Sequence, residues 1–578
     1  MKIVVAKTAG FCMGVRRAVE LALDAPSQQK QPIFTYGPLI HNPQVLGMFA
    51  ERGVTVLEEI PCQANGTVLV RAHGVPPETK QQLKETGFAV IDATCPKVVK
   101  VQSIIKSHAR KNFSVISVGE QDHPEVVSLL GFAGEKGWVV GSLVALQALP
   151  AFDQAIVVAQ TTQNQLLYQR VKTWVGEHRG HYKVFDTICD STERRQTEVR
   201  RLAMEVDAVV VVGGKNSGNT RRLAEIVREA GKSAFHIESE AELDREALRS
   251  MQAIGITAGA STPTWIIKRV VRALEQMPIH RSDGIRSLLP RLTRLALLTN
   301  LYVALGAGCL CYAAMHLQRL PTSWPAAGVA MLYVLSMHIL NHLTSRAEDR
   351  YNDPDRERFY RQHKIVLTAM ALSAGALGLV AAFQLGAVPF WTLLVMSLLG
   401  LSYNLRLLPA NVCPTCRFRR IRDLPGSKTI LIALAWGVVT AGLPALSAKS
   451  GQWAVGGLAV IWASATAFSR TAFFDLLDIQ GDRIVGKETI PILLGAERGL
   501  LLLKIVLGAL LVILLTAGWG AIFSPLAFLL TICPICLWAI IGLHERHGML
   551  AGMQLEFMVE SLFVLTGLLT FVWLVAAA

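Results

Sequence analysis

The chain has 578 residues, of which 52% are hydrophobic, and its formal net charge is +14 at pH 7. The length exceeds that of one ordinary domain and the composition changes near residue 290, so we expect two domains, residues 1–280 and 292–578, joined by a linker at 281–291. The positive charge does not indicate a nucleic-acid-binding protein, because much of it lies in short loops between apolar segments of the second domain.

The chain opens with a short apolar strand, a lone cysteine between two glycines and a basic helix, KIVVAKTAGFCMGVRRAVE at residues 2–20. The same order of strand, cysteine and basic helix returns around Cys95 and Cys189. A helix N-terminus favours a thiolate, although Cys12 taken alone could equally be a small buried hydrophobe. Because these three cysteines are not in C-x-x-C pairs, neither a zinc ribbon nor a thioredoxin-type pair fits, and we interpret them as three converging thiolates.

Between these cysteines, apolar runs such as GTVLVRAHG, FSVISVG, AIVVAQTT and DAVVVVGG alternate with helical segments. This alternation is typical of parallel sheets covered by helices, so residues 1–280 are predicted to form a soluble α/β domain. We recognise no cleavable signal peptide, and free thiolates suit a reducing compartment.

Histidines and small polar residues follow several of the predicted strands. In α/β folds this is where ligands bind. The glycines allow the backbone to approach a ligand closely, and the hydroxyl and amide groups at helix starts are neutral donors, so the set predicts an anion pocket that suits a diphosphate. Its members are His41, His73, His123, Gly213, Gly214, Ser217, Gly218, Asn219 and Ser261.

Eight segments of this domain, over residues 1 to about 278, closely resemble the 4-hydroxy-3-methylbut-2-enyl diphosphate reductase (LytB-type) family. The resemblance implies a three-module α/β fold around a 4Fe-4S cluster held by Cys12, Cys95 and Cys189, with one iron left open for the substrate. The segments are AGFCMGVRRAVE, GPLIHN, RAHGVPP, DATCPKV, HPEV, AQTT, KNSGNT and TAGAS.

The resemblance also implies the reaction, a reductive loss of the substrate hydroxyl that gives isopentenyl and dimethylallyl diphosphate. Glu125 would be the proton source and Thr161 would contact the hydroxyl. A ferredoxin or flavodoxin would supply electrons, because the domain shows no flavin-binding signature and no second cysteine cluster. Gly218 is a departure, since some relatives have a second serine there. The diphosphate would be held by His41, His73, His123, Thr192, Ser217, Gly218, Asn219 and Ser261.

From Leu292 onward, nine apolar stretches of about twenty residues follow one another, each long enough to cross a bilayer. Loops 346–364 and 404–428 are rich in Arg and Lys, which by the positive-inside rule places them and the first domain in the cytoplasm. We therefore expect an all-α, multi-pass domain in the cytoplasmic (inner) membrane. The stretches are 292–317, 324–343, 364–385, 387–408, 428–447, 453–474, 498–517, 521–543 and 555–576.

Three aspartates, Asp475, Asp478 and Asp482, recur at i, i+3 and i+7 and so share one face of a predicted membrane helix. An aspartate inside a membrane helix costs roughly 2.5 to 3.5 kcal/mol on insertion scales. Three together predict a metal site or an ion path, and hard carboxylates suit Mg²⁺ that bridges to a diphosphate.

The aspartate pattern and the nine stretches resemble the UbiA-type membrane prenyltransferases over about 290–578. The second motif of that family, D-x-x-D-x-x-x-D, is complete here. The first motif, N-D-x-x-D-x-x-x-D, reads NHLTSRAED, which keeps Asn341 and Asp349 as possible Mg²⁺ ligands but replaces two aspartates by His342 and Ser345. The resemblance implies a prenyl diphosphate and an acceptor as partners. Other residues that fit the family's cytoplasmic loops are Tyr403, Arg406, Asp423 and Lys428.

Several alternatives remain open for the second domain. It could be a catalytically inactive anchor or lipid-binding module. A third interpretation, for the whole chain, is a zinc-stabilised soluble domain that regulates a transporter, which would need zinc ligands other than the three widely spaced cysteines. Asp353 and Asp355 either compensate for the altered motif or are solvated loop charges. His338 either lines a cavity or makes a buried hydrogen bond. Two C-x-x-C pairs, Cys413 with Cys416 and Cys533 with Cys536, are weak candidates for a metal site.

Overall fold

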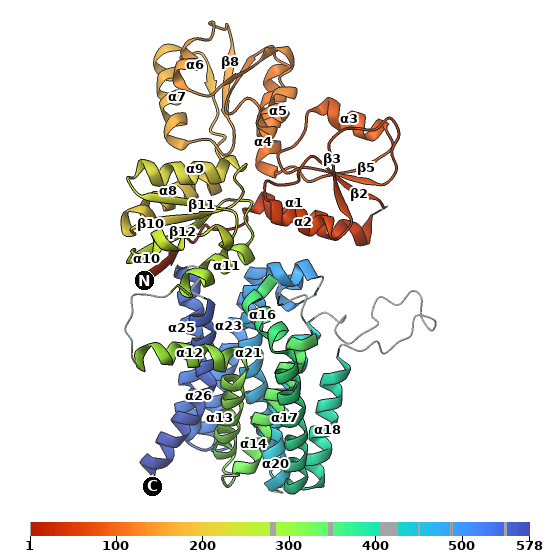
Figure 1. Cartoon of the computed structure of the whole chain (residues 1–578), viewed down its shortest axis with the longest axis vertical. Helices are drawn as coiled ribbons and strands as arrows, with labels where there is room; N and C mark the ends of the chain where they lie inside the picture. Colours follow the sequence, from red (N-terminus) through yellow and green to blue (C-terminus); the bar gives the residue numbers. More distant parts are fainter. Residues whose placement is uncertain are drawn as a thin grey trace. The chain divides into compact units, whose positions relative to one another are not determined.

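The computed structural model shows two compact units, Met1–His280 and Arg281–Ala578, which are described separately. Figure 1 shows the helices and strands of each unit. Residues 281–284 of the predicted linker lie outside the described residues, and residues 285–291 belong to helix α12 (Ile285–Leu298). The described residues are 2–29, 31–277, 285–344, 349, 351–403, 426–448, 451–485, 487, 489–547 and 552–577.

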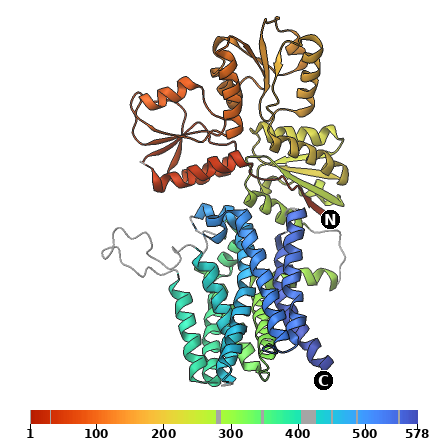
Figure 2. The same cartoon turned by 180° about the vertical axis from the view of Figure 1, so that it is seen from behind.

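The first unit contains three four-stranded parallel sheets, which Figures 1 and 2 show as separate modules. One sheet has the order β3-β2-β4-β5 and another the order β7-β6-β8-β9, which is the same strand order. The third, β11-β10-β12-β1, repeats it with the first strand of the chain at its edge. The predicted α/β class with parallel sheets is therefore confirmed, and the three units predicted from the cysteine repeat correspond to three sheets.

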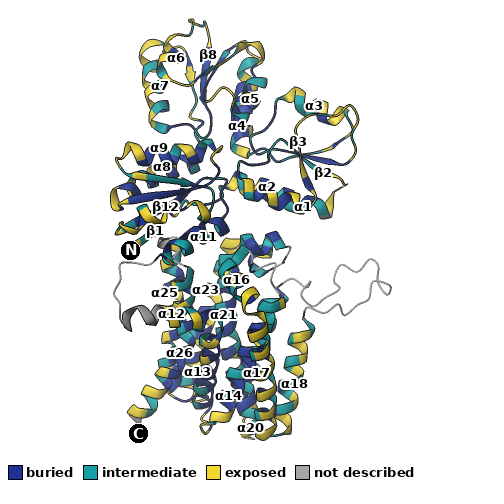
Figure 3. Cartoon of the chain, in the orientation of Figure 1, coloured by how far each residue is buried: buried dark blue, intermediate teal, exposed yellow. Residues whose placement is uncertain are grey.

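Continuous apolar runs form the central strands, because a parallel strand covered on both faces has no solvent side. Every residue of β8 and β10 is buried, and Figure 3 shows the buried strands in dark blue beneath helices with exposed outer faces. The strands are β1 Lys2–Val5, β2 Ile33–Tyr36, β3 Val54–Leu57, β4 Thr67–Val70, β5 Ala89–Asp92, β6 Ser114–Val118, β7 Gly137–Val140, β8 Ala155–Ala159, β9 Lys183–Val184, β10 Ala208–Val212, β11 Ser233–Ile237 and β12 Ala253–Ala258.

Helices join most successive strands, and α1, α4 and α8 join strands of different sheets. Most of the helices begin at a side chain that caps the first turn, such as Asn42 before α2 or Ser217 before α9. They are α1 Met13–Gln28, α2 Pro43–Ala50, α3 Pro77–Glu85, α4 Pro96–Ala109, α5 Pro124–Gly131, α6 Leu143–Gln147, α7 Gln165–His178, α8 Asp190–Glu205, α9 Gly218–Glu229, α10 Arg245–Arg249 and α11 Thr264–Glu275.

The second unit is entirely helical in its described residues. Large hydrophobic side chains such as Ile365, Phe383 and Trp391 are exposed on its helices. Exposed apolar residues in this number are typical of a surface that lipid covers. The helices are α12, α13 Leu301–Leu317, α14 Trp324–Thr344, α16 Pro354–Gln362, α17 Lys364–Leu385, α18 Ala387–Ser402, α19 Ser427–Gly437, the π-helical turn η4 Val438–Gly442, α20 Leu443–Ala448, α21 Trp453–Val485, α22 Ile490–Leu494, α23 Ala496–Trp519, α24 Leu526–Leu530, α25 Ile532–His547 and α26 Gly552–Ala577.

Among the described residues, six segments are long and apolar enough to span a membrane, so the prediction of nine is confirmed only in part. The predicted span 292–317 is bent by 76° between α12 and α13. Asn300 makes this bend with a left-handed φ of 59°, which asparagine tolerates better than most residues, and its amide donates to the Tyr360 hydroxyl at 2.7 Å. The six segments are Trp324–Thr344, Lys364–Leu385, Ser427–Ala448, Ala496–Trp519, Leu526–Glu545 and Gly552–Ala576.

Two other predicted spans also differ from expectation. Helix α18 is apolar but ends at Ser402, and the rest of the predicted span 387–408 beyond residue 403 lies outside the described residues. The predicted span 453–474 lies within α21, a helix of 33 residues that is missing from the six. Polar residues such as Ser464, Ser469 and Arg470 interrupt its apolar sequence.

Candidate functional site

The three cysteines of the first unit occupy equivalent positions in the fold. Cys12, Cys95 and Cys189 are the N-cap residues of α1, α4 and α8, and the Cys12 sulfur accepts a hydrogen bond from the Val15 backbone N–H at 3.5 Å. All three line one cavity of about 90 Å³. The structure thus brings together residues that are separated by more than 170 positions between Cys12 and Cys189.

Gly14 allows the first two cysteines to approach each other. A Cβ atom at this position would lie 2.3 Å from the Cys95 sulfur, closer than any real contact. Burial raises the pKa of the Cys95 thiol, and the neighbouring Cys12 and Cys189 thiolates raise it further, against the lowering effect of two backbone N–H groups. A buried thiol such as Cys95, with two other cysteines close by, fits a site that binds a metal group, because the metal neutralises the thiolates that bind it.

Three histidines line the same cavity. The ring centroids of His41 and His73 are 4.7 Å apart, and those of His73 and His123 are 5.5 Å apart. Burial lowers the pKa of His123 to about 4 and that of His73 well below its usual value, and nearby cationic groups including Arg71 lower both further. The rings are therefore neutral at pH 7 until a negatively charged ligand arrives to favour the charged form.

The same three rings offer nitrogen atoms within 4.8 Å of one another, a spacing that a metal ion could also use. The surroundings favour an anion instead. Arg71 and Arg221 act on His41 and His123 as positive charges, which would repel a cation. Buried atoms without a partner in the described residues include His41 Nε2, His73 Nδ1 and the donor Asn219 Nδ2.

Neutral donors from α9 and the β12–α11 loop lie beside the histidines. Ser217 caps α9, while the Ser261 hydroxyl donates to the His41 carbonyl at 3.1 Å. Gly214 must be glycine, because an added Cβ would lie 2.6 Å from the His41 carbonyl oxygen. An added Cβ at Gly218 would meet only ordinary contacts at 3.8 Å, so there is space for the serine that some relatives have at this position.

Glu125 and Thr161 form a buried pair at the cavity. The Thr161 backbone N–H donates to Glu125 Oε1 at 2.6 Å and the Thr161 hydroxyl donates to Oε2 at 2.9 Å. Burial raises the pKa of Glu125 to about 7, although both hydrogen bonds from Thr161 oppose the shift. A carboxyl group with this pKa can hold a proton at neutral pH and release it during a reaction.

The residues that the sequence placed in this site line the cavity, Thr192 included, except Gly213 and Gly214, which lie in the turn before α9 and do not line it. Three polar residues that the sequence did not single out also line the cavity: Lys97, Thr162 and Ser191. Their only signal in the sequence is that each lies within two positions of a predicted site residue. Lys97 makes an ion pair with Asp190 at 2.9 Å, which joins the first turns of α4 and α8 beside two of the cysteines.

In the second unit, the three aspartates lie on α21. Asp475 is buried and accepts a hydrogen bond from the Thr429 hydroxyl, while buried Asp482 accepts one from the Asn352 amide at 2.9 Å. Asp478 is partly exposed between them. Carboxylates that ligate metal ions are themselves usually hydrogen-bonded, so this oxygen-rich helix face fits Mg²⁺.

The altered first motif is arranged differently. The His342 ring is 3.0 Å from the carboxylate of Asp349, so this aspartate already has a partner. Asp353 caps α16 and lies 3.6 Å from Arg356, and Asp355 lies 3.7 Å from Arg294. These two aspartates are thus structural ion-pair partners. Ser345, Arg406, Asp423, Cys413 and Cys416 lie outside the described residues.

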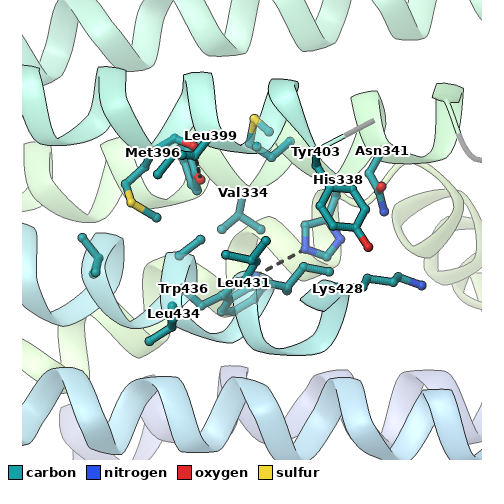
Figure 4. A pocket seen from close by; sticks show the side chains of 16 residues that line it. Val334, His338, Asn341, Met396, Leu399, Tyr403, Lys428, Leu431, Leu434 and Trp436 are labelled. Carbon is teal, nitrogen blue, oxygen red and sulfur yellow. Dashed lines mark hydrogen bonds between the residues drawn. The ribbon is translucent and has the colours of Figure 1, made fainter. Parts of the chain in front are cut away.

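A pocket of about 380 Å³ lies among α14, α18 and α19 (Figure 4). His338, Asn341, Tyr403 and Lys428 gather at one end, and apolar side chains such as Met396 and Leu434 line the rest. The Trp436 indole N–H donates to His338 at 3.4 Å, so His338 both lines a cavity and makes a buried hydrogen bond. Cys533 and Cys536 lie apart from this pocket on α25, and their metal-binding role stays a prediction.

The comparisons with known proteins divide the chain in the same way. The family model described as LytB protein matches residues 3–275, and the UbiA prenyltransferase family matches residues 300–549. A 4-hydroxy-3-methylbut-2-enyl diphosphate reductase from Trichlorobacter lovleyi is 42% identical over 277 residues, which cover 48% of this chain and 99% of the relative.

Two solved structures are also similar. The E-1-hydroxy-2-methyl-but-2-enyl-4-diphosphate reductase from Plasmodium falciparum is 25% identical, with a TM-score of 0.46, over 48% of this chain and 89% of that one. A UbiA homolog from Archaeoglobus fulgidus bound to GPP and Mg²⁺ is 18% identical, with a TM-score of 0.35, over 47% of this chain and 98% of that one.

We predict that Gly14→Ala lowers the iron content of the purified protein several-fold, because the added Cβ occupies the space of the Cys95 sulfur. Iron and sulfide analysis of anaerobically purified protein measures this. The matched control is Gly176→Ala on α7, where nothing lies within 4 Å of the added Cβ. Equal iron content in the two variants would contradict the prediction that Cys12 and Cys95 hold an iron-sulfur cluster.

Proposed function

The chain belongs to the 4-hydroxy-3-methylbut-2-enyl diphosphate reductase (LytB) family over its N-terminal half, and from this membership we propose a reductase fused to a membrane domain of the UbiA family that binds or transfers prenyl diphosphates. The observation that carries the reductase assignment is the buried Glu125–Thr161 pair, which shares one cavity with three cysteines and three histidines. Proton donor, anion pocket and thiolate ligands are all required by this reaction.

The substrate carries a diphosphate at one end and a hydroxyl at the other. We assign the diphosphate to His41, His73, His123 and the donors of α9 and Ser261, which become charged or hydrogen-bonded when the anion enters. The hydroxyl is then directed toward Thr161 and the cysteines. Cys12, Cys95 and Cys189 would hold the 4Fe-4S cluster, and the chemistry that this group supplies when bound is delivery of two electrons from a ferredoxin or flavodoxin.

The remaining steps belong to side chains of this chain. Breaking the carbon–oxygen bond with two electrons leaves a hydroxide equivalent and a carbanion equivalent, so two protons must be added. Glu125 donates one of them through its contact with Thr161, and the hydroxyl leaves as water. The other proton is taken up at carbon, and its position decides between isopentenyl and dimethylallyl diphosphate.

For the membrane domain we propose that Asp475, Asp478 and Asp482 hold Mg²⁺ against the diphosphate of a longer prenyl substrate. The 380 Å³ pocket supports this proposal. Its polar end carries Lys428, and the neighbouring residue Thr429 donates a hydrogen bond to Asp475, while the apolar walls suit a hydrocarbon chain. Asp349 would contribute less than a complete first motif would, since it is already paired with His342. The positive loops favour a cytoplasmic site on the inner membrane.

The second candidate is a membrane domain that only anchors the reductase. The observation that favours it is the replacement of two expected aspartates by His342 and Ser345. Under this alternative the pocket holds a lipid chain without reaction, and the reductase is the only catalyst in the chain.

Replacing Glu125 with Gln should slow turnover by about 10² to 10⁴ while substrate binding and iron content are retained, because the amide keeps the shape but has no acidic proton to transfer. Reductase assays with an artificial electron donor measure this. In the unaltered enzyme the rate should fall as pH rises through about 7. Glu125 carries the proton that it donates below its pKa of about 7 and loses this proton above it. Near-normal turnover of Glu125→Gln would remove this residue from the mechanism.

Asp478→Asn should weaken Mg²⁺-dependent binding of a long-chain prenyl diphosphate by about tenfold or more, because it removes the charge of one of three oxygen ligands. Binding to the full chain in nanodiscs, with and without Mg²⁺, is the measurement. The control is Asp355→Asn, whose carboxylate lies beside Arg294. If the full chain binds nothing, or Asp478→Asn binds normally, the anchor alternative is correct.

A further inference from the structure

Helix α8 carries a buried arginine six residues after Cys189. Arg195 is only 4% exposed, and its guanidinium donates to the Gly10 carbonyl at 2.7 Å and to the Ala258 carbonyl at 3.2 Å. Gly10 lies two residues before Cys12, and Ala258 ends β12 just before the loop whose Ala260 carbonyl accepts the Cys12 N–H. Arg195 therefore connects α8, which begins after Cys189, to both segments that position Cys12.

The charge of Arg195 is not balanced in the usual way. A buried guanidinium normally pairs with a carboxylate, because an unpaired buried charge is costly. Within the described residues, Arg195 bonds only to main-chain carbonyls, and its Nε atom has no partner. Burial lowers its pKa, and the groups that oppose this are first the Cys12 and Cys189 thiolates and then Glu198.

Glu198, one turn further along α8, uses its carboxylate for a different purpose. It accepts hydrogen bonds from the Lys7 and Thr8 backbone N–H groups at 2.7 and 2.9 Å and from the Thr8 hydroxyl at 2.6 Å. These contacts hold the start of the loop that leads to Cys12. The positive charge of Arg195 thus faces the cysteine site while the negative charge of Glu198 is directed to the loop.

We propose that Arg195 is a positioning residue that places Cys12 and Cys189 and also provides a fixed positive charge that raises the reduction potential of the cluster bound there. The inference rests on the proposed iron-sulfur cluster. Such a cluster with its thiolates is negatively charged and becomes more negative on reduction, and net charge, hydrogen bonding and exposure to solvent set its potential. A buried cation beside the thiolates stabilises the reduced state most.

This makes electron transfer from an external donor easier, because a more positive potential of the acceptor makes the free energy of the transfer more favourable. A purely structural role for Arg195 makes a different prediction. In that case Arg195 acts only through its two hydrogen bonds to the Gly10 and Ala258 carbonyls, and replacement by lysine or by glutamine should change the potential equally. If the charge matters, lysine should preserve the potential and glutamine should not.

The test uses the full chain, purified anaerobically in detergent, with iron analysis and a redox titration followed by electron paramagnetic resonance. Arg195→Gln should shift the potential to a more negative value, while Arg195→Lys should stay near the unaltered protein. Arg201→Gln is the matched control, because it makes the same change on an exposed face of the same helix. Glu198→Gln should shift the potential in the positive direction, since it removes a negative charge close to Arg195.

Equal shifts in Arg195→Lys and Arg195→Gln, or an unchanged potential in Arg195→Gln with normal iron content, would overturn the proposal. If Arg195→Gln loses its iron, Glu198→Gln decides: a positive shift supports the charge effect and no shift overturns it. Absence of iron from the unaltered protein is a separate result, which would reject the cluster itself and the proposed reductase with it.

Discussion

The first unit depends on the convergence of three cysteine sulfurs that belong to three different turns. Each sulfur sits at the start of a helix, where free backbone N–H groups favour its ionised form. Burial raises the pKa of Cys95, and repulsion from the Cys12 and Cys189 thiolates raises it further. Gly14 supplies the space, Arg195 supplies charge and hydrogen bonds, and the three sheets fix the turns that carry the cysteines.

Around this centre, the cavity keeps its titratable groups close to neutrality. The histidines have lowered pKa values and Glu125 has a raised one, in each case mainly because burial disfavours charge. A site in this condition should respond strongly to a charged ligand, since a bound diphosphate would restore the charge of the histidines without removing the proton of Glu125. Under the proposed roles, anion binding and proton donation are separated within one small cavity.

Much of the first unit could be predicted from the sequence, because the repeated strand–cysteine–helix order indicates both the modules and the position of the site. Arg195 could not, since it lies in the charged segment ERRQTEVRR, where the sequence does not distinguish a buried arginine from its exposed neighbours. The break at Asn300 was also missed, because apolar composition gives no sign of a left-handed residue. For α21, the polar residues that face other helices reduce the apolar signal that identifies a span.

The edge position of β1 has a consequence for how the unit is assembled in the cell. Val5 pairs with Ile256, and the Cys12 N–H bonds to the Ala260 carbonyl, so β1 and Cys12 find these backbone partners near the end of the domain. Cys12 therefore cannot reach its final position until nearly the whole first unit has left the ribosome. By then the first apolar helices of the second unit are already being synthesised. Insertion of the proposed cluster would then coincide with or follow the synthesis of these helices, and contacts so distant in sequence favour slow folding.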